Sequence, residues 1–281
     1  MEMEAEKKLK SFSWFGDSKQ KFEAAGELYT KASNSYLLAK KPLLAGAALT
    51  QAANCYLNTN ITKYEAASCY VKAANCYKKE NSSAAVESMN KAIALYTEDG
   101  RFNMAAKYEK ELAELLEAEN EFQSSLQHYQ TASEYFEHEG STSSANSCLL
   151  KVAHFSASLQ NFRKAIEIFE QVATTSLSNN LLKWSVKEYF LKAGLCHLAE
   201  GDVVGAKKAL DRYAKQSPDF NGSREHKFLI QLTEAFENFD QDEFKNAVGE
   251  FDSISKLDEW KSAILVTISE KLKEDEEEDL T

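Results

Sequence analysis

The fold is decided by the stretch KYEAASCYVKAANCY (63–77), in which aromatic residues and alanines recur at intervals of three or four. This interval places the recurring side chains on one face of an α-helix. The members of that face alternate between large and small: Tyr64, Ala67, Tyr70, Ala74 and Tyr77. A small residue that faces a large one allows neighbouring helices to approach closely and interlock. The stretch therefore predicts a helix that packs against others along a continuous apolar seam.

The same frame recurs along most of the chain. It starts near residues 22, 43, 64, 83, 102, 122, 142 and 162, with loop signals between the starts at Asn58–Asn60, Asn81–Ser83, Asp99–Gly100, Glu139–Ser144 and Ser178–Asn180. Helices of about 15 residues joined by short loops explain this spacing. Two helices per repeat give a unit of about 40 residues, which is longer than the roughly 34 of a tetratricopeptide repeat but uses a similar Ala/aromatic pattern. We therefore predict an all-α, tetratricopeptide-like array of antiparallel helical hairpins.

The repeat becomes indistinct after about residue 180. Further helices are predicted at 183–198, 203–214, 225–238, 241–251 and 256–273. We interpret them as a C-terminal helical bundle that caps the last repeat. The predicted domains are thus 1–180 for the hairpin repeats, 181–273 for the bundle and 274–281 for a solvated acidic tail.

Composition agrees with a helical binding protein. Glycine (10) and proline (2), which helix interiors tolerate poorly, are scarce in the 281 residues. The net charge is −11, and general nucleic-acid binding requires a basic protein, so nucleic acid is not an expected partner. The run EDEEED (274–279) carries six of the acidic groups, which leaves a body near −5 that can still hold a local basic face.

The cysteines and the N-terminus indicate where the chain works. Five cysteines without a CxxC pair are typical of buried, reduced thiols: Cys55, Cys69, Cys76, Cys148 and Cys196. The sequence contains no run of 18 apolar residues, and MEMEAEKKLK (1–10) lacks the apolar core of a signal peptide. We expect a cytoplasmic protein that is at most peripheral on membranes.

Motifs for catalysis are absent from the sequence. It has no GxxxxGK[ST] phosphate loop, no HExxH and no GxSxG. The five histidines are scattered: His128, His138, His154, His197 and His226. We therefore predict no catalytic residue, no metal site and no cofactor, and expect the function to be binding.

Several blocks of the sequence resemble the soluble NSF attachment protein (SNAP) family. They are GRFNMAAKYEKELAELLE (100–117), SSANSCLLKVAHFSASLQNFRKAIEIFEQVA (143–173), LLKWSVKEYFLKAGLCHL (181–198), EFDSISKLDEWKSAIL (250–265) and EDEEEDL (274–280). The resemblance covers nearly the whole chain. It implies a twisted sheet of helical hairpins, wound as a right-handed superhelix, followed by a C-terminal bundle. It also implies an adaptor through which the ATPase NSF disassembles SNARE complexes in vesicle-mediated protein transport.

The resemblance assigns two sets of charged residues to partners. The family's basic residues, which face the acidic surface of the SNARE four-helix bundle, correspond to Lys79, Arg101, Lys107, Lys151, Lys187 and Arg224. One departure is Ser147, where the animal alpha form has lysine. The residues that dock on NSF and stimulate its ATPase correspond to Asp202, Glu234, Glu237 and Leu280. For any single lysine or arginine, an ordinary solvated surface charge is the alternative reading.

A third feature is the aromatic group Phe12, Trp14 and Phe15 in KSFSWFGDSKQKF (10–22). The rings either pack against the first hairpin or touch a membrane, where aromatic side chains suit the interface and the flanking lysines attract anionic headgroups. In the SNAP family a hydrophobic loop here aids membrane attachment. The expected partners are therefore a SNARE complex, the NSF hexamer and, weakly, a membrane surface. The alternative is a general tetratricopeptide-like scaffold that binds peptides.

Overall fold

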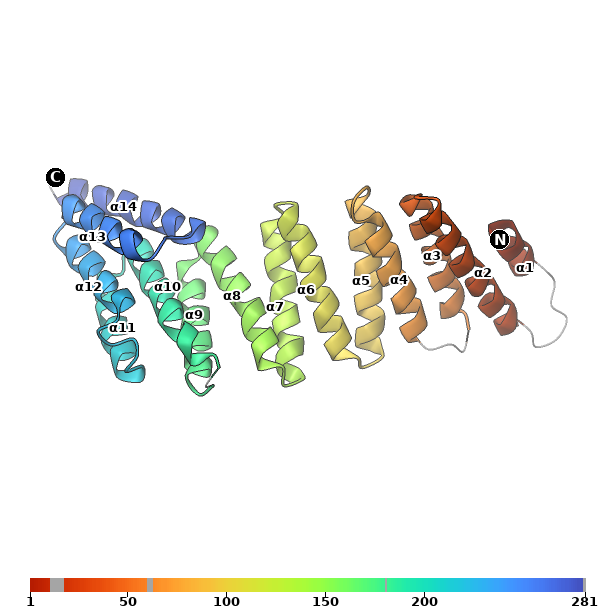
Figure 1. Ribbon diagram of the computed structural model, residues 1–281, viewed down its shortest axis with the longest axis horizontal. Helices are drawn as coiled ribbons and strands as arrows, with labels where there is room; N and C mark the ends of the chain where they lie inside the picture. The colour runs from red at the N-terminus through yellow and green to blue at the C-terminus, as the bar shows by residue number, and fades with distance from the viewer. Residues whose placement is uncertain (11–17, 60–62, 180, 280–281) are drawn as a thin grey trace. The chain divides into compact units, whose positions relative to one another are not determined.

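The computed structural model describes residues 1–10, 18–59, 63–179 and 181–279 (Figure 1). In these ranges every regular element is helical, with fourteen α-helices and one 3-10 turn. The all-α prediction is confirmed. The chain divides into two compact units, Met1–Ala145 and Asn146–Thr281.

Unit 1 consists of helices that pack against their neighbours in chain order. They are α1 (Glu2–Lys10), α2 (Ser18–Leu38), α3 (Pro42–Leu57), α4 (Lys63–Tyr77), α5 (Ser82–Glu98), α6 (Phe102–Ala118) and α7 (Phe122–His138), and α8 (Thr142–Ser158) begins at its end. Sequential packing of this kind is the signature of a helical-repeat array.

Unit 2 is built around α10. It contains most of α8, then α9 (Phe162–Leu177), the 3-10 turn η1 (Lys183–Ser185), α10 (Val186–Glu200), α11 (Val203–Gln216), α12 (Arg224–Glu237), α13 (Gln241–Ile254) and α14 (Glu259–Asp279). Helix α10 packs against α9, α11, α12 and α14, and residues from Phe190 to Ala199 are nearly all buried. Because α9 packs on α10, α9 groups with the bundle by contact. A functional boundary near residue 180 remains a prediction.

The helices are joined by a recurring three-residue turn whose middle residue is left-handed. That residue is Gly100 (φ 71°), Asn120 (φ 62°), Gly140 (φ 71°) or Gln160 (φ 59°), so it returns at a fixed interval. In each turn the following amide donates to a carbonyl five residues back, as Arg101 does to Tyr96 at 2.8 Å. This bond satisfies a carbonyl at the helix end and reverses the chain direction. The spacing of the repeated sequence pattern therefore matches the spacing between these turns.

Small residues in unit 1 receive tyrosine rings from neighbouring helices. A Cβ atom added to Gly26 in α2 would lie 2.5 Å from Tyr56 of α3, and one added to Gly46 in α3 would lie 2.6 Å from Tyr77 of α4. Alanines of the same frame, such as Ala67, are fully buried. The predicted small-against-large seam is confirmed, and it brings helix backbones close together.

The acidic run forms part of the last helix. Helix α14 continues to Asp279, so residues 274–279 extend it instead of forming a separate irregular segment. Four of the six residues of the run are glutamate, a good helix former, and neither glycine nor proline interrupts it, which explains why the helix continues beyond the predicted end at 273. The last turn contains no basic residue, so the acidic run opposes the negative end of the helix dipole.

The seam predicts a specific sensitivity at Gly46. Gly46→Val forces Tyr77 to move, and overpacking of this kind costs about 1–3 kcal/mol. Hydrogen exchange of the α3 and α4 amides should become faster, by the factor in the unfolding equilibrium constant to which this loss of free energy corresponds. Tyr77→Ala should relieve the clash, so the double variant is expected to be less destabilised than the sum of the single variants.

Gly249 in α13 provides the matched control, because a Cβ added there meets nothing within 4 Å. Gly249→Ala should stabilise the helix by roughly 0.5–1 kcal/mol. Additive effects of Gly46→Val and Tyr77→Ala would contradict the interlocking of these two residues.

Candidate partner-binding surfaces

Arg101 is held against a row of tyrosine rings where α6 begins. Its Nε donates to the Asp99 carboxylate at 2.7 Å, and its guanidinium lies 4.8 Å from the Tyr64 ring centroid. Tyr96 stacks on Tyr108 with centroids 5.4 Å apart and meets Tyr64 edge-on at 6.0 Å. A cation over an aromatic face is an attractive contact. Arg101 therefore has a structural role in joining α4, α5 and α6 as well as presenting charge.

The two predicted lysines of unit 1 are exposed. Lys79 lies in the turn after α4. The Lys107 side chain is 57% exposed, and its Nζ lies 3.7 Å from a Glu111 carboxylate oxygen and 5.3 Å from the Tyr108 ring centroid. An exposed pair one helical turn apart contributes only about 0–1 kcal/mol, so Lys107 can exchange Glu111 for another anion at little cost.

The predicted basic residues of unit 2 occupy three different helices. Lys151 on α8 is half-buried, with Nζ 5.9 Å from the Phe155 ring centroid. Lys187 on α10 is half-buried, and Arg224 is exposed at the first position of α12. With the three residues of unit 1, the set lies on or directly beside α4, α6, α8, α10 and α12. Four of the six basic residues therefore lie on even-numbered helices, and Lys79 and Arg101 lie in the turns directly beside α4 and α6.

Three helices of unit 2 are antiparallel, which gathers acidic groups at one end. Phe228 of α12 stacks on Phe251 of α13 with centroids 4.2 Å apart, close to where α12 begins and α13 ends. A groove between α13 and α14 is lined by residues from Phe244 to Asp252 on one side and from Leu257 to Ser269 on the other, so the two helices lie side by side. Because only residues 255–258 join them, they run in opposite directions. The end of α12, the start of α13 and the end of α14 therefore lie together.

This end contains the predicted NSF-docking residues that the structure describes. Glu234 and Glu237 are exposed in the last turn of α12, and Glu237 forms an ion pair with Lys207 of α11. Asp202 caps the start of α11, and a Cβ added to the preceding Gly201 would lie 3.1 Å from Lys271 on α14. The structure thus brings the three acids to the same end as the acidic part of α14.

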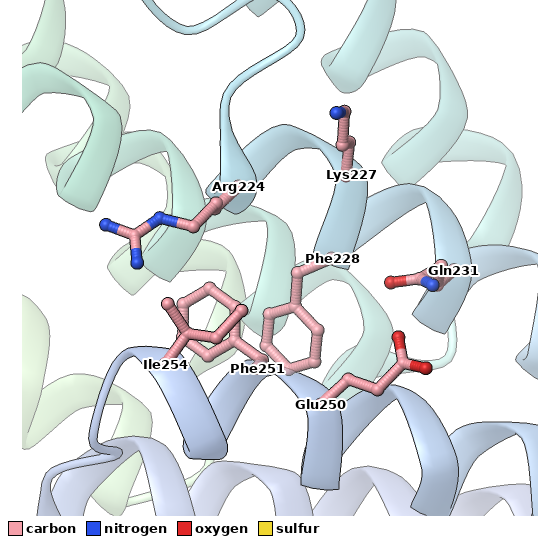
Figure 2. Close-up of a pocket in the computed structure, with 7 residues that line it drawn as sticks. All are labelled: Arg224, Lys227, Phe228, Gln231, Glu250, Phe251 and Ile254. Carbon is pink, nitrogen blue, oxygen red and sulfur yellow. The ribbon is translucent and has the colours of Figure 1, made fainter.

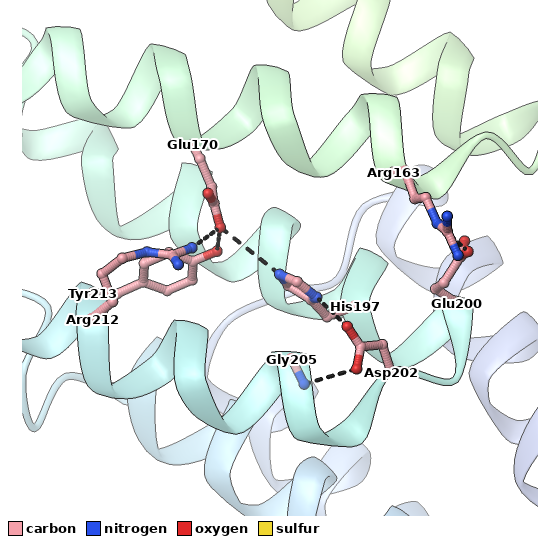
Figure 3. A network of polar contacts seen from close by, with 8 residues as sticks. All are labelled: Arg163, Glu170, His197, Glu200, Asp202, Gly205, Arg212 and Tyr213. Atoms are coloured by element: carbon pink, nitrogen blue, oxygen red, sulfur yellow. Dashed lines mark hydrogen bonds and ion pairs between the residues drawn. The ribbon is translucent and has the colours of Figure 1, made fainter.

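Asp202 also belongs to a network of polar contacts (Figure 3). One oxygen accepts from the Gly205 amide at 2.8 Å, and the other lies 3.7 Å from His197 Nδ1. The opposite ring nitrogen is 3.8 Å from Glu170, which also accepts from Tyr213 and Arg212. Burial alone raises the pKa of the Glu170 carboxyl, but these three partners together hold it below its ordinary value.

The three acidic residues therefore differ in their structural roles. Asp202 caps α11 and Glu237 forms an ion pair with α11, whereas the Glu234 side chain has no ion-pair partner among the described residues. Changes at Glu234 test surface charge without disturbing a contact.

Comparison with known proteins identifies the family. The sequence model described as "Soluble NSF attachment protein, SNAP" matches residues 1–273. The chain belongs to this family. It is 42% identical over 282 residues to an alpha-soluble NSF attachment protein of Vitis vinifera, covering 100% of this chain and 96% of that protein. The Homo sapiens protein of the same name is 41% identical, with 98% and 94% covered, and that of Saccharomyces cerevisiae is 35% identical, with 96% and 92% covered.

The sequence block 250–265, which resembles the SNAP family, fastens α14 to the rest of unit 2. Lys261 is only 8% exposed and donates to Glu188 of α10 at 2.7 Å, and it lies 3.1 Å from Asp258 at the start of α14. The equally buried Lys192 of α10 lies 3.6 Å from the same Glu188 carboxylate. Two buried ammonium groups thus share one carboxylate, and removing it would take the ion-pair partner from Lys192 and leave Lys261 with Asp258 alone.

His154 and Trp260 complete this cluster. Trp260 Nε1 donates to the His154 carbonyl at 3.3 Å, and its ring lies 5.1 Å from the His154 ring and 5.7 Å from Phe169. Lys192 Nζ is 2.9 Å from His154 Nε2. Because an ammonium only donates, Nε2 accepts and the imidazole is neutral. The contact between His154 and Trp260 was not predicted, since a contact across 106 residues leaves no local pattern.

Some predicted site residues lie outside the described part of the chain. They are Phe12, Trp14 and Phe15 of the aromatic segment and Leu280 near the C-terminus. Among the described helices, none combines the length and apolar composition that crossing a bilayer requires. Within the same residues, no group of three or more His, Cys, Asp or Glu side chains is arranged to hold a metal ion.

The cluster predicts a pH dependence of unit 2. Burial, followed by the charge of Lys192, lowers the pKa of His154 to about 4. Since the folded state binds the proton less readily than the unfolded state, the stabilisation is complete above the unfolded pKa of about 6.5 and is lost as pH falls toward 4. Between pH 6.5 and 5 the loss should be about 2 kcal/mol, measurable from urea unfolding.

His154→Phe retains a ring against Trp260 and Phe169 but cannot be protonated. This variant should flatten the pH dependence between 6.5 and 5, whatever its absolute stability. His138→Asn, at an exposed imidazole of unit 1, is the control and should leave the slope unchanged. An unchanged slope in His154→Phe would show that another group titrates in this window.

Proposed function

We propose that this chain is an adaptor that binds assembled SNARE complexes and recruits and stimulates the ATPase NSF, so that SNAREs are disassembled in vesicle-mediated transport. The observation that carries the proposal is the family match across residues 1–273, together with relatives named as NSF attachment proteins over their almost full length. We further propose that the chain has no catalysis of its own and that NSF supplies the ATP hydrolysis.

The proposed SNARE-binding residues are Lys79, Arg101, Lys107, Lys151, Lys187 and Arg224. Their position on or beside alternate helices supports a distributed contact in which each charge contributes little. Electrostatic contacts on a polar surface are weakened by salt and tolerate variation in the partner's sequence. Several adaptor copies around one SNARE bundle would add these weak contacts together. Ser147 reduces the charge near Lys151 by one group relative to the animal alpha form.

The proposed NSF-docking residues are Asp202, Glu234, Glu237 and Leu280. The common end of α11, α12 and α14 supports a single acidic platform. The acidic run at the end of α14 opposes the helix dipole, so it is better explained by a basic partner than by helix stability. Opposite charge would speed the encounter with NSF, and Leu280 would add an apolar contact.

A membrane contact is proposed for Phe12, Trp14 and Phe15. Helix α1, which precedes them, carries exposed Lys7, Lys8 and Lys10. Basic residues beside aromatic ones suit an anionic lipid surface. Three rings give weak and reversible attachment, which is useful once the SNARE complex already tethers the adaptor to its membrane.

The decisive experiment for the SNARE surface combines Lys107→Glu with Lys151→Glu. Both changes reverse charge at positions proposed to face an acidic bundle, so affinity for the SNARE complex should fall at least about tenfold. Disassembly with NSF and ATP should be abolished at physiological salt. Arg101 is unsuitable for this test because its loss would also disturb the tyrosine row.

Lys208→Glu on α11 is the matched control, since it reverses an exposed lysine outside the proposed set. It should support disassembly at the wild-type rate. Wild-type activity of the Lys107/Lys151 double variant would refute the basic-surface assignment.

The acidic platform is tested by Glu234→Lys together with Asp202→Asn. Asparagine keeps the oxygen that caps α11, and Glu234 has no partner to lose, so the fold should be unaffected. Stimulation of the NSF ATPase should fall about tenfold while SNARE binding is retained.

Glu80→Lys, in an exposed turn of unit 1, serves as the control for a similar change of net charge. If it reduces NSF stimulation as strongly as the platform variant, the effect comes from total charge and not from the end of unit 2.

A further inference from the structure

An open pocket lies between α12 and α13 (Figure 2). It is lined by the first residue of α12 and the last residue of α13, so it lies at the opposite end of these helices from the acidic platform. Its volume is about 190 Å³, and its walls come from both helices: Arg224, Lys227, Phe228, Gln231, Glu250, Phe251 and Ile254. Among these residues only Arg224 has an assigned role.

The floor of the pocket is apolar. Phe228 and Phe251 stack at 4.2 Å and are 1% and 9% exposed, so they belong to the core and give the floor a fixed shape. Ile254 stands beside them but is 68% exposed. Ile254 is therefore an aliphatic side chain in contact with water beside an aromatic surface. Another apolar group in the pocket would bury it, which is energetically favourable.

One side of the rim is basic. Arg224 and Lys227 lie in the first turn of α12 and are exposed, and neither has an ion-pair partner among the described residues. Two other exposed lysines of unit 2, Lys207 and Lys256, are paired with carboxylates. The positive end of the helix dipole adds to the two unpaired cations. This part of the rim therefore favours carboxylates.

The other end of the pocket has the opposite preference. Figure 2 shows Glu250 and Gln231 on the side away from Arg224, which stands over Ile254. A carboxylate placed beside Glu250 would be repelled. The pocket thus distinguishes the two ends of an elongated ligand: the acidic part fits over α12's first turn and a neutral or basic part fits beside Glu250.

We propose that this pocket receives one aliphatic side chain from an acidic helical segment of the SNARE complex, with a neighbouring carboxylate of that segment bound by Arg224 and Lys227. The inference rests on the proposed function and adds to it an apolar anchor that salt does not screen. Three observations support this occupant. The pocket has room for one side chain, its rim has two cations without ion-pair partners among the described residues, and its isoleucine is exposed.

The chain's own acidic end has a similar charge but cannot reach the pocket. Helix α14 runs back along α13, so Asp279 lies about 30 Å along the helix from Glu259, which follows the pocket's Ile254 by five residues. The acidic run of α14 therefore lies far from the pocket, and an acidic segment of another molecule is the better occupant.

The test is the affinity of the full chain for an assembled soluble SNARE complex, measured by calorimetry from low to high salt. Ile254→Ser should weaken binding about fivefold at every salt concentration, because it removes apolar contact without changing charge. Arg224→Ala with Lys227→Ala should weaken binding at low salt and flatten the salt dependence, because it removes two cations.

Two matched controls keep the result specific. Val266→Ser changes another exposed aliphatic residue, on α14 and outside this pocket, and Lys208→Ala with Lys215→Ala removes two exposed cations of α11. Both should bind the SNARE complex like the wild type. Circular dichroism checks that every variant is folded.

Wild-type affinity of Ile254→Ser would overturn the pocket assignment, and loss of binding in Lys107→Glu/Lys151→Glu in the same assay would show that the proposed function nevertheless stands. If the wild type self-associates, and Ile254→Ser abolishes this association and leaves SNARE affinity unchanged, the occupant is the acidic end of a second copy and the proposal fails. If the wild type does not bind the SNARE complex, both proposals fail.

Discussion

Neighbouring helices in unit 1 meet where a residue with little or no side chain faces an aromatic ring. Gly26 against Tyr56 and Gly46 against Tyr77 are the tightest of these contacts. Close approach fixes the separation of the helices, and the large ring fixes how one helix sits along the next. Because protein interiors are close-packed and barely compressible, a chain of such contacts transmits displacement with little internal yielding. An adaptor between a motor and its substrate needs that property.

The interlocked interior forces charged residues to the surface, where some of them also serve the fold. Arg101 covers Tyr64, Asp202 caps α11 and Glu237 pairs with Lys207. For Arg101 and Glu237, partner binding and local stability cannot be separated by simple substitution, whereas asparagine at Asp202 keeps the capping oxygen and removes only the charge. Lys107 and Glu234 differ because the fold requires little from either. The distinction matters for reading any mutational scan, since loss of function at Arg101 would not by itself indicate a contact with a partner.

The sequence was sufficient for the features that are local and periodic. The predicted frame at 63–77 corresponds to α4, and the predicted bundle helices agree with the observed ones to within a few residues at most ends. It was insufficient where distant segments meet. His154 and Trp260 are in contact although 106 positions separate them in the sequence, and no pattern in either segment predicts the contact. Lys192 and Lys261 read as ordinary helix-surface lysines, yet both are buried around Glu188. The pocket of Arg224 also depends on the antiparallel packing of α12 and α13.

The buried charges around Glu188 lie at the start of α14, and this position determines how α14 would transmit a mechanical force. Its acidic end is the part proposed to contact NSF, whereas its first turn is fixed by Lys261 to Glu188 of α10 and by Trp260 to α8. Between the two ends, Ile264, Ile268 and Leu272 are buried along the helix. These aliphatic contacts hold α14 against the bundle, but they contain no directional bond. Ion pairs in a buried site are directional and cannot slide without exposing an uncompensated charge. A force that pulls on the acidic end would therefore be resisted mainly by the ion pairs at the opposite end of the helix. In this arrangement α14 transmits force along its whole length as one rigid helix.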